Sequence, residues 1–535
     1  MDTIENLLER LEQLNDIGAS LSRERDITPL LERILLAAKA LTNADGGTIY
    51  RVTEDGHYLR FEIVRTDSLQ IALGGTTGKP ITFPNLPLRT EAGAPNDSLV
   101  AAHCAFHCRT VNVADAYTDP AFDFSGTRRF DLTTGYRSKS FLTVPMKDHA
   151  GDVIGVLQLI NARAPGGTEV VPFSLSDQSL VESLASQAAI ALTNRNLISQ
   201  LENLFESLIQ LINLAIDEKS HYTGGHCQRV PALTLMLADT VAQTTEGPMA
   251  DFRMDERDRY ELKIASLLHD CGKITTPVHV VDKATKMQTL YDRIGLIDTR
   301  FEVLKRDAEI AALRAQLALR PCVDAAAEAR IDEAAQAERA AMDQDRDFLR
   351  HSNVGTEAMD ESAMERILRI ASGRRWRNPA GESVPFLDED EFENLSIRTG
   401  TLTQSERATI NYHIISTIKM LEHLPWPKHL KRVPEFAGGH HERMDGKGYP
   451  KGLKRDEMSV QARIMGIADI FEALTASDRP YKKGMTLSQA IEIMKRFKAS
   501  GHIDPDLFDI FLKERVYAQY AQEFLEPWQI DDVMP

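Results

Sequence analysis

Histidines and aspartates that could bind metal ions concentrate between residues 226 and 469 of the 535-residue sequence. Seven of them lie in apolar or glycine-rich stretches far apart along the chain: His226, His269, Asp270, His413, His440, His441 and Asp469. Imidazole and carboxylate donors without a matching set of thiolates are typical of catalytic Fe, Mn, Co, Ni or Zn sites, whereas structural zinc sites favour cysteine. A carboxylate inside an apolar run also costs free energy unless it is paired or bound to a metal. The residue types therefore predict a catalytic metal site.

Each of these residues also has a simpler interpretation. A lone histidine in an apolar helix, such as His413, is more often a hydrogen-bonded core residue than a ligand. The dipeptides His269-Asp270 and His440-His441 can each occur on a surface. The seven residues fall in five separate stretches with helical patterns, and together they are hard to explain as core filling, so we favour the metal site.

The region that must position these residues is predicted to be helical. Residues 221–515 repeat apolar side chains every three to four positions, as amphipathic helices do. Residues from about 291 to 398 differ, because they are rich in Ala, Glu, Arg and Asp. They predict an exposed helical hairpin followed by an irregular loop at 373–391. This insertion could cover the site as a lid, dock on another domain, bind a partner, or form a surface excursion that leaves the site intact.

The first half of the chain predicts a different class of fold. Residues 25–175 mix short β-like runs with helical segments, and His149-Ala150-Gly151 separates two of the runs as a hairpin turn would. Residues 176–220 contain leucines at spacings of three to four and neither Pro nor Gly, which predicts one long helix. That helix could pair with a second copy as a parallel coiled coil, or it could pack on its own domain.

The expected architecture is therefore multidomain. We predict a helix at 1–24, an α+β domain at 25–175, a coiled-coil connector at 176–220, an all-α domain at 221–515 and a tail at 516–535. The formal charge of −17 argues against DNA, RNA or an anionic membrane as partners. The sequence lacks an apolar run of membrane-spanning length and a signal-peptide layout, and its five cysteines are irregularly spaced. We therefore expect a cytoplasmic protein.

Four motifs resemble those of the HD-GYP family, a branch of the HD metal-dependent phosphohydrolases. HDCGKI at 269–274 carries the HD signature, and HHERMDGKGYP at 440–450 carries the GYP signature in full. TGTLTQSERATINYH at 399–413 is similar to the helix with the mid-domain histidine, and ARIMGIADIFEALTASDRPYKK at 462–483 to the following helix and its basic loop. The resemblance implies hydrolysis of cyclic di-GMP, a bacterial second messenger, to the linear dinucleotide pGpG, with GMP left open as a final product.

The same resemblance implies a binuclear site with two bridged metal ions. The first ion would bind His226, His269, Asp270 and Asp469. The second ion would share Asp270 and bind His413, His440 and His441. Some family members hold a third metal with a Glu where this sequence has Tyr222, so we expect two ions. Iron or manganese is the expected metal, and nickel, cobalt or zinc is possible.

The family also implies roles around the metals. Two cations lower the pKa of a shared water, which then attacks the phosphodiester, so Asp270 and Lys273 are the expected catalytic residues. Lys273 would reach the phosphate as a point charge, and Arg479 and Lys482 would bind phosphate from the basic loop. The GYP loop comprises Asp445, Gly446, Gly448, Tyr449 and Pro450. For Tyr449 we favour packing or a protein partner over catalysis.

Residues 25–175 resemble a GAF domain, a sensor fold that binds small molecules. The carrier of this resemblance is FDFSGTRRFDLTTGYRSKSFLTVPMKDHAGDVIGVLQLINA at 122–162. The Lys and Glu of the signature found in cyclic-nucleotide-binding GAF domains are missing, so the ligand stays unknown. HCAFHC at 103–108 places His103 and His107, and Cys104 and Cys108, one helical turn apart. That spacing suits metal, haem or redox sensing, and equally suits small residues packing a helix.

The expected function is therefore that of a sensor-regulated phosphodiesterase. A homodimeric helical connector would carry a signal from the GAF domain to the catalytic domain. Two alternatives stay open. The substrate could be another cyclic dinucleotide, such as a mixed GMP-AMP ring, or the chain could be an adaptor that binds protein partners through its GYP loop.

Overall fold

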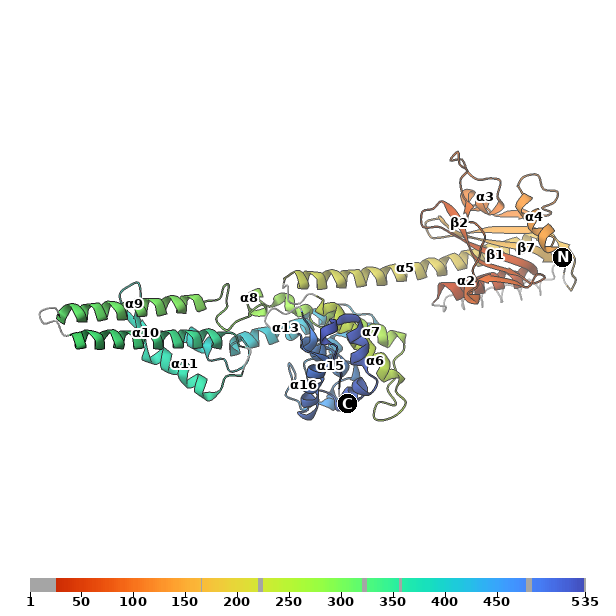
Figure 1. Ribbon diagram of the computed structural model, residues 1–535. Coiled ribbons are helices and arrows are strands. Elements are labelled where there is room, and N and C mark those ends of the chain that lie inside the picture. Colours follow the sequence, from red (N-terminus) through yellow and green to blue (C-terminus); the bar gives the residue numbers. More distant parts are fainter. Residues whose placement is uncertain are drawn as a thin grey trace. The chain divides into compact units, whose positions relative to one another are not determined.

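The computed structural model describes residues 26–164, 166–219, 225–319, 325–355, 358–477 and 484–533. The chain forms two compact units that divide between Leu204 and Phe205. The first unit contains a β-sheet with helices on its faces, and the described part of the second is helical apart from one short β-hairpin (Figure 1). The predicted multidomain fold, α+β followed by all-α, is confirmed. The helix predicted at 1–24 lies outside the described residues.

The sheet of the first unit is antiparallel, with strand order β3-β2-β1-β7-β6-β5, and β4 and β8 pair with β2 and β7. Its strands are β1 Ala44–Val52, β2 Tyr58–Thr66, β3 Ile71–Gly74, β4 Leu86–Pro87, β5 Val111–Val113, β6 Phe141–Lys147, β7 Val153–Arg163 and β8 Val170–Val171. The predicted hairpin around His149 is present, since β6 and β7 pair antiparallel on either side of it. The helices of this unit are α2 Ile27–Thr42, α3 Val100–His107, α4 Ser125–Thr134 and the start of α5 Leu175–Lys219.

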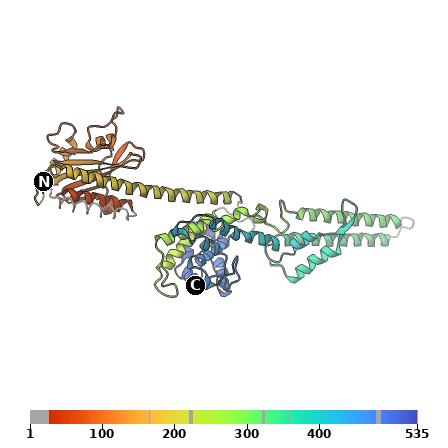
Figure 2. The same ribbon diagram turned by 180° about the vertical axis from the view of Figure 1, so that it is seen from behind.

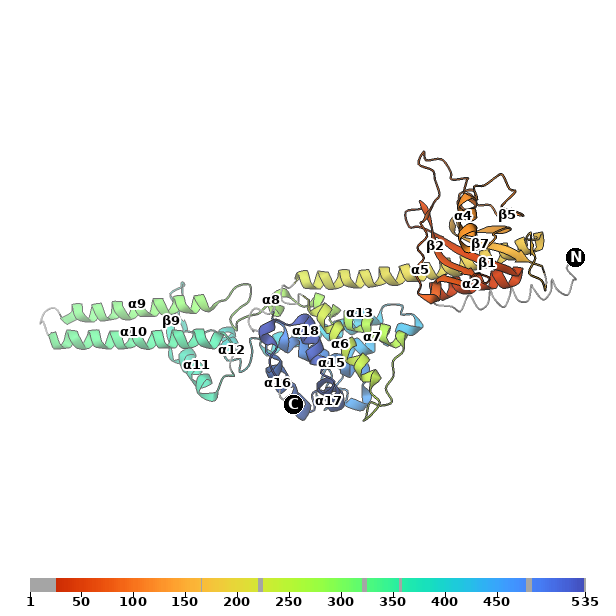
Figure 3. The same ribbon diagram turned by 45° about the vertical axis from the view of Figure 1, so that its right-hand side comes forward.

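The two faces of the sheet carry separate cores, because side chains alternate along a strand. Ile49 of β1 and Leu157 of β7 are buried in a core that includes α2 and α5. Their neighbours Tyr50 and Val156 are buried on the other face, in a core that includes α3. Figures 1 and 3 show α2 and α5 on one face of the sheet and α3 and α4 on the other.

Helix α5 is a single helix of 45 residues that contributes to the cores of both units. Leu184 and Ala188 are fully buried in the core under the sheet, and Ile209 and Ile216 are buried in the core of the helical unit. The apolar residues at the two ends of the predicted connector are therefore buried by packing on the chain's own domains. A further set of apolar residues on α5 is exposed: Leu197, Leu201, Leu204, Leu208 and Leu211.

The helical unit is built around one large core of aliphatic and aromatic side chains. Its helices are α6 His226–Gln243, α7 Glu256–Leu268, η2 Cys271–Thr275, α8 Val278–Val281, α13 Gln404–Glu422, η3 Lys428–Leu430, α14 Val433–Gly438, η4 Arg455–Glu457, α15 Val460–Thr475, α16 Leu487–Ala499, α17 Pro505–Lys513, α18 Val516–Phe524 and η5 Pro527–Gln529. The residues predicted as a tail form α18 and η5, and Tyr520 is buried in this core. Among the described helices of the chain, none combines the length and the apolar character needed to span a bilayer.

The insertion forms a long antiparallel helical pair, as predicted (Figures 1 and 2). Its elements are α9 Ile294–Leu319, α10 Ala325–Asn353, α11 Glu361–Gly373, β9 Arg375–Arg377, β10 Ser383–Pro385 and α12 Glu389–Leu395. The prediction of an irregular loop at 373–391 is wrong, because this segment contains the hairpin of β9 and β10. Strands of three residues are too short to show a two-residue periodicity. The rings of Phe301 and Phe386 pack against each other with centroids 4.5 Å apart, in a small core that the insertion forms together with Met287.

A buried carboxylate, Asp504, joins the start of α17 to the rest of the helical unit. Its side chain is fully buried, accepts hydrogen bonds from the Asp506 and Leu507 N–H groups, and pairs with Arg455 and Arg463. Burial alone would raise the pKa of Asp504, but the hydrogen bonds from Arg455 and Leu507 and the charge of Arg463 hold it below its ordinary value. The ionised form therefore stabilises the fold above the unfolded-state pKa of about 3.9, and this contribution is lost as the pH falls.

We predict that Asp504→Asn lowers the free energy of unfolding of the helical unit by roughly 3 kcal/mol at pH 7, because the buried site loses its anion: Arg463, whose side chain is 11% exposed, loses its carboxylate partner, and Arg455 retains Asp506. The variant should also lose less stability than the wild type as the pH falls toward 4. Urea unfolding followed by tryptophan fluorescence measures this, since all three tryptophans lie in the helical unit. Asp509→Asn, which removes an exposed partner of Lys498, should change the stability by less than about 1 kcal/mol. Equal losses in both variants would contradict the assignment.

Candidate metal centre

Helix ends and helix interiors bring the seven predicted ligands into one region. His226 is the first residue of α6, and His269 and Asp270 follow the last residue of α7. His413 and Asp469 lie inside α13 and α15, and the pair His440-His441 follows α14. Gly272 lets η2 approach α13, because a Cβ at this position would lie 2.0 Å from the His413 carbonyl oxygen. The HD pair is therefore held directly against the helix that carries His413.

One group of donor atoms surrounds the Oδ2 oxygen of Asp270. His226 Nε2 lies 2.9 Å from this oxygen, and His269 Nε2 lies 3.2 Å from it. The two imidazole Nε2 atoms are 3.3 Å apart. Asp469 Oδ1 completes the group, at 3.4 Å from His226 Nε2 and 4.0 Å from His269 Nε2. These four side chains match the first predicted ligand set.

A second group of donor atoms lies on the other side of the Asp270 carboxylate. His413 Nε2 is 3.2 Å from Asp270 Oδ1 and 3.2 Å from His441 Nε2. The rings of His440 and His441 are 4.0 Å apart, and candidate ligand atoms of His413, His440 and His441 all lie within 4.8 Å of one another. Asp270 thus faces one histidine group with each of its two oxygens, as a carboxylate that bridges two cations would.

The hydrogen bonds of the histidines show which nitrogen is available to a metal. Nδ1 of His269, His413 and His440 donates to the carbonyl oxygens of Ser266, Ile410 and Ala437 at 2.6–2.7 Å. Nδ1 of His226 lies 2.6 Å from the Glu472 carboxylate. Because these acceptors carry no proton, each Nδ1 must donate, and in a neutral imidazole the Nε2 lone pair is then free. In all four rings Nε2 is therefore the nitrogen that a metal would bind. Burial opposes the charged form of His226, but Glu472 and Asp270 raise its pKa to about 9, so this ring would release a proton on binding a metal.

Several polar atoms of the site have no hydrogen-bond partner among the described residues. These include the buried Nε2 of His440 and Oδ1 of Asp270. The contact between Asp270 Oδ1 and His413 Nε2 brings two lone pairs together, which is unfavourable unless a positive charge lies between them. Unpaired nitrogen and oxygen donors that face one another across a buried site fit a pair of divalent cations.

Burial and neighbouring charges set the protonation of the site. Burial, followed by the neighbouring His269, lowers the pKa of His440 to about 4. Burial and the adjacent His440 hold the pKa of His441 well below its usual range. Both imidazoles are therefore neutral at pH 7, as metal ligands must be. Burial alone would raise the pKa of Asp270, but the charges of Lys273 and His269 hold it well below its ordinary value.

Lys273, the predicted phosphate ligand, lies beside the bridging aspartate. Its Nζ is 2.5 Å from Asp270 Oδ2, and its side chain is 24% exposed. The ammonium group thus neutralises part of the carboxylate charge and reaches the solvent side of the site. The two other predicted phosphate ligands, Arg479 and Lys482, lie outside the described residues, as does Tyr222.

Glu472 is a residue of the site that the sequence does not single out. Its fully buried carboxylate accepts from His226 Nδ1 at 2.6 Å and from Arg229 Nε at 2.8 Å. Burial would raise the pKa of Glu472, but the charges of His226 and Arg229 lower it to about 2. An acidic residue in the apolar run of α15, three positions after Asp469, is the signal that could have identified it.

The GYP loop is closed by Glu442 and two glycines. The buried Glu442 carboxylate accepts from the Lys451 and Leu453 N–H groups at 2.7 and 2.9 Å. A Cβ at Gly448 would lie 2.4 Å from the Arg443 nitrogen, and Gly446 has a φ of 76°, so both positions favour glycine.

The loop places its tyrosine against the metal centre. The Tyr449 ring stacks on the His441 ring, with centroids 4.9 Å apart and an interplanar angle of 29°. The side chain of Asp445 pairs with Arg443 at 2.8 Å and accepts from the Lys447 N–H at 3.0 Å. Pro450 follows Tyr449 through a cis peptide bond. Tyr449 therefore packs on a predicted ligand, and the rest of the loop is held by its own contacts and by the hydrogen bond from the Asp445 N–H to the Gly501 carbonyl oxygen at 3.0 Å.

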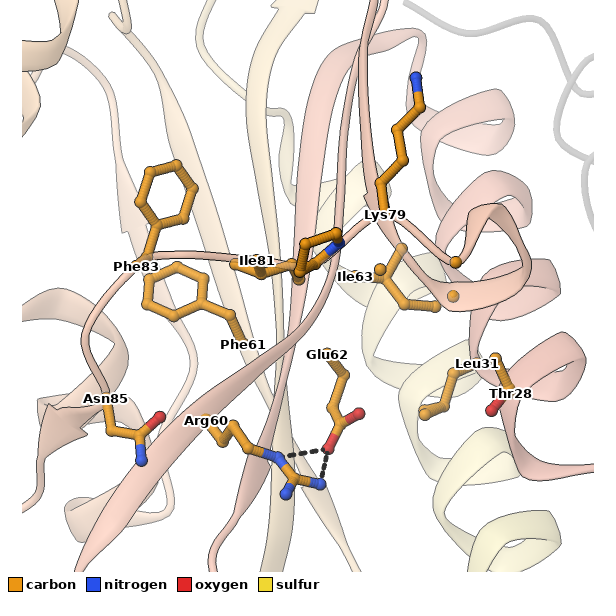
Figure 4. A pocket seen from close by; sticks show the side chains of 14 residues that line it. Thr28, Leu31, Arg60, Phe61, Glu62, Ile63, Lys79, Ile81, Phe83 and Asn85 are labelled. Atoms are coloured by element: carbon orange, nitrogen blue, oxygen red, sulfur yellow. Dashed lines mark hydrogen bonds and ion pairs between the residues drawn. The ribbon is translucent and has the colours of Figure 1, made fainter.

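The first unit contains a cavity of about 400 Å³ beside β2. Phe61 and Phe83, with ring centroids 5.3 Å apart, line it together with the ion pair of Arg60 and Glu62 (Figure 4). A lining that mixes aromatic and charged side chains suits a small molecule with both apolar and polar surface. A GAF domain is expected to take such a ligand.

Comparison with protein families identifies two domains. Residues 26–192 match the model of the GAF domain, and residues 390–507 match a model of the HD domain. The chain therefore contains a GAF domain followed by an HD domain, and the recognition of both from sequence motifs is confirmed. The HD match covers His413 and Asp469 but begins at residue 390, near the end of the insertion, so it does not include His269 and Asp270. In the structure, His269 and Asp270 from before the insertion lie beside His413 and Asp469 from the matched segment.

Curated relatives of the chain are cyclic dinucleotide phosphodiesterases. A 3'3'-cGAMP-specific phosphodiesterase of Vibrio cholerae is 36% identical over 130 residues, which is 24% of this chain and 29% of the relative. A cyclic di-GMP phosphodiesterase of Pseudomonas aeruginosa is 38% identical over 116 residues, or 22% and 27%. A cyclic di-GMP phosphodiesterase of Thermotoga maritima is 32% identical over 121 residues, or 23% and 32%. The chain thus spans about a third or less of the relatives that it matches.

We predict that Glu472→Ala weakens metal binding by 10- to 100-fold, because the His226 imidazole loses the carboxylate that orients it and fixes its tautomer. Glu472→Gln keeps an acceptor oxygen and should lose less. Chelator competition on the full chain measures the affinity, with tryptophan fluorescence to confirm folding. Glu492→Gln, an exposed change on α16, is the matched control. Unchanged affinity in a folded Glu472→Ala variant would contradict the role of this residue.

Proposed function

We propose that the chain is a metal-dependent phosphodiesterase that hydrolyses cyclic di-GMP to pGpG. The observation that carries the proposal is the convergence of histidine Nε2 atoms on the two oxygens of Asp270. Similarity of the second half to named cyclic dinucleotide phosphodiesterases supports the reaction class. Because this substrate class is an intracellular second messenger, we place the reaction in the cytoplasm.

The donor set fits two divalent cations, and we propose iron or manganese, with nickel, cobalt or zinc as possible substitutes. The first would be held by His226, His269, Asp270 and Asp469. The second would be held by Asp270, His413, His440 and His441. When bound, a pair of divalent cations activates water for attack on a phosphodiester and neutralises the charge of the phosphate oxygens.

The residues of the chain have distinct tasks in this reaction. Asp270 is the ligand that both cations would share. Its carboxylate is buried between the two groups of histidines, so each oxygen faces one group. Lys273 carries a positive charge at the solvent side, where the phosphate would enter, and it moves between Asp270 and the substrate. Glu472 holds the imidazole of His226 in one orientation and one tautomer. Arg479 and Lys482 are proposed to bind the phosphates from the basic loop.

A second candidate substrate is 3'3'-cGAMP, because one of the similar proteins is named for it. Both rings present the same phosphodiester to the metals, so only the base contacts separate them. Parallel assays with both dinucleotides decide between the two, and faster turnover of the mixed ring would replace cyclic di-GMP in the proposal. The seven convergent ligands argue against an adaptor without turnover.

We further propose that the GAF domain regulates this activity in a homodimer formed through α5. Exposed Leu197, Leu201, Leu204, Leu208 and Leu211 are 45% to 64% exposed and alternate spacings of four and three residues. That is the heptad pattern of a parallel coiled coil, and a second copy presents an identical stripe. A paired helix could transmit a change in register or angle from the sensor to the catalytic domain.

We predict that His269→Ala and His413→Ala each remove one metal ion per chain and lower the rate of cyclic di-GMP hydrolysis by about three orders of magnitude, because losing one cation removes several kcal/mol of charge stabilisation. Asp270→Asn should affect both ions. Metal content and turnover of the anaerobically purified full chain measure these effects. His423→Ala, an exposed histidine at the end of α13, is the control. Wild-type turnover in Asp270→Asn would end the proposal.

We predict that the double substitution Leu201→Glu and Leu208→Glu converts a dimer into a monomer, because like charges replace apolar contacts at the seam. Sedimentation velocity of the full chain measures the oligomeric state. Gln200→Glu and Gln210→Glu add the same charge at two other exposed positions of α5 and should leave the dimer intact. A monomeric wild type, or a dimer that survives the leucine substitutions, would exclude pairing through this stripe.

A further inference from the structure

A second cluster of metal-binding side chains lies in the N-terminal unit, apart from the catalytic site. Asp97 precedes α3, and His103 and His107 lie one turn apart on that helix. His103 Nδ1 is 2.9 Å and His107 Nε2 is 2.6 Å from the same oxygen, Asp97 Oδ1. The three ligand atoms all lie within 4.8 Å of one another, and the ring centroids of the two histidines are 4.5 Å apart.

The helix presents its histidines and its cysteines differently. Cys104 is fully buried, its thiol lies 3.5 Å from the Thr143 carbonyl oxygen of β6, and burial raises its pKa. The Cys108 thiol lies 3.8 Å from the Ala105 carbonyl oxygen. His103 and His107, four residues apart, keep about a third of their side chains exposed. The motif at 103–108 therefore offers two imidazoles to a ligand, whereas Cys104 packs against the sheet.

The loop that carries Asp97 is anchored on both sides of this residue. Asn96 donates from its side chain to the Pro87 carbonyl oxygen at 2.9 Å, and the Ser98 carbonyl oxygen accepts from the Asp123 N–H at 2.8 Å. The Phe122 ring meets the His103 ring edge-on at 5.3 Å. The Asp97 carboxylate and the His103 imidazole are thus held in place before any ligand binds, which lowers the entropy cost of binding.

We propose that Asp97, His103 and His107 bind one divalent transition-metal ion, with zinc as the best-suited ion. Two imidazole nitrogens and one carboxylate oxygen form a three-ligand set that leaves positions open for solvent or a small ligand. Each imidazole would bind the ion through the nitrogen that faces Asp97 and would carry its proton on the other ring nitrogen. The ion would tie the loop before α3 to the helix and thereby connect the sensor domain to metal availability.

Without a metal, the same trio can be a local hydrogen-bond cluster in which Asp97 accepts from both rings. The hydrogen-bond cluster and the metal site differ in the number of metal ions bound per chain, which can be measured on the full-length protein. The protein is stripped with a chelator and dialysed against buffered Zn²⁺, and the bound zinc is counted per chain. We expect His107→Ala and Asp97→Asn to bind one zinc ion fewer than the wild type. His57→Ala, an exposed histidine in the turn between β1 and β2, should bind as many as the wild type.

Repeating the count in an Asp270→Asn background separates this site from the catalytic centre. In that background, adding His107→Ala should still lower the zinc count by one ion per chain. The single variant His107→Ala should hydrolyse cyclic di-GMP at the wild-type rate once the catalytic metals are loaded. Equal zinc counts in the wild type and His107→Ala, or a difference that vanishes in the Asp270→Asn background, would overturn the proposal. Circular dichroism verifies that each variant is folded.

Discussion

A single buried carboxylate, Asp270, is the interaction on which the helical unit's site depends. Its two oxygens face two groups of histidines, with His226 Nε2 at 2.9 Å from one and His413 Nε2 at 3.2 Å from the other. An anion in that position is stable only with positive charge around it, and Lys273 supplies part of it. The rest of the required charge is what a pair of cations would provide.

The packing of the helices serves this arrangement. Gly272 lets the segment after Asp270 touch α13. The backbone carbonyl oxygens of α7, α13 and α14 accept hydrogen bonds from histidine Nδ1 atoms, and these bonds keep a proton on each Nδ1. Glu472 does the same for His226 from α15. Rigid elements thus hold the donors before any metal binds, which is the arrangement that precise metal sites need.

Much of this was predictable from sequence because seven imidazoles and carboxylates in apolar or glycine-rich stretches are, taken together, hard to explain as core filling. The seven ligand candidates, the α+β domain and the helical pair of the insertion were all readable from residue types and periodicity. Glu472 was not, since its partner His226 lies 246 residues away and only folding joins them. The β9–β10 hairpin was missed because three-residue strands carry no periodicity. The burial of Tyr520 in the main core was missed because short terminal helices reveal no partner.

The central claim is that Asp270 bridges two metal ions, and anomalous X-ray diffraction from crystals of the anaerobically purified protein at the metal absorption edge tests it most directly. The account predicts two anomalous peaks, one beside each oxygen of Asp270, with His226 and His269 at the first and His413, His440 and His441 at the second. One peak alone, or two peaks of which neither contacts Asp270, would contradict it.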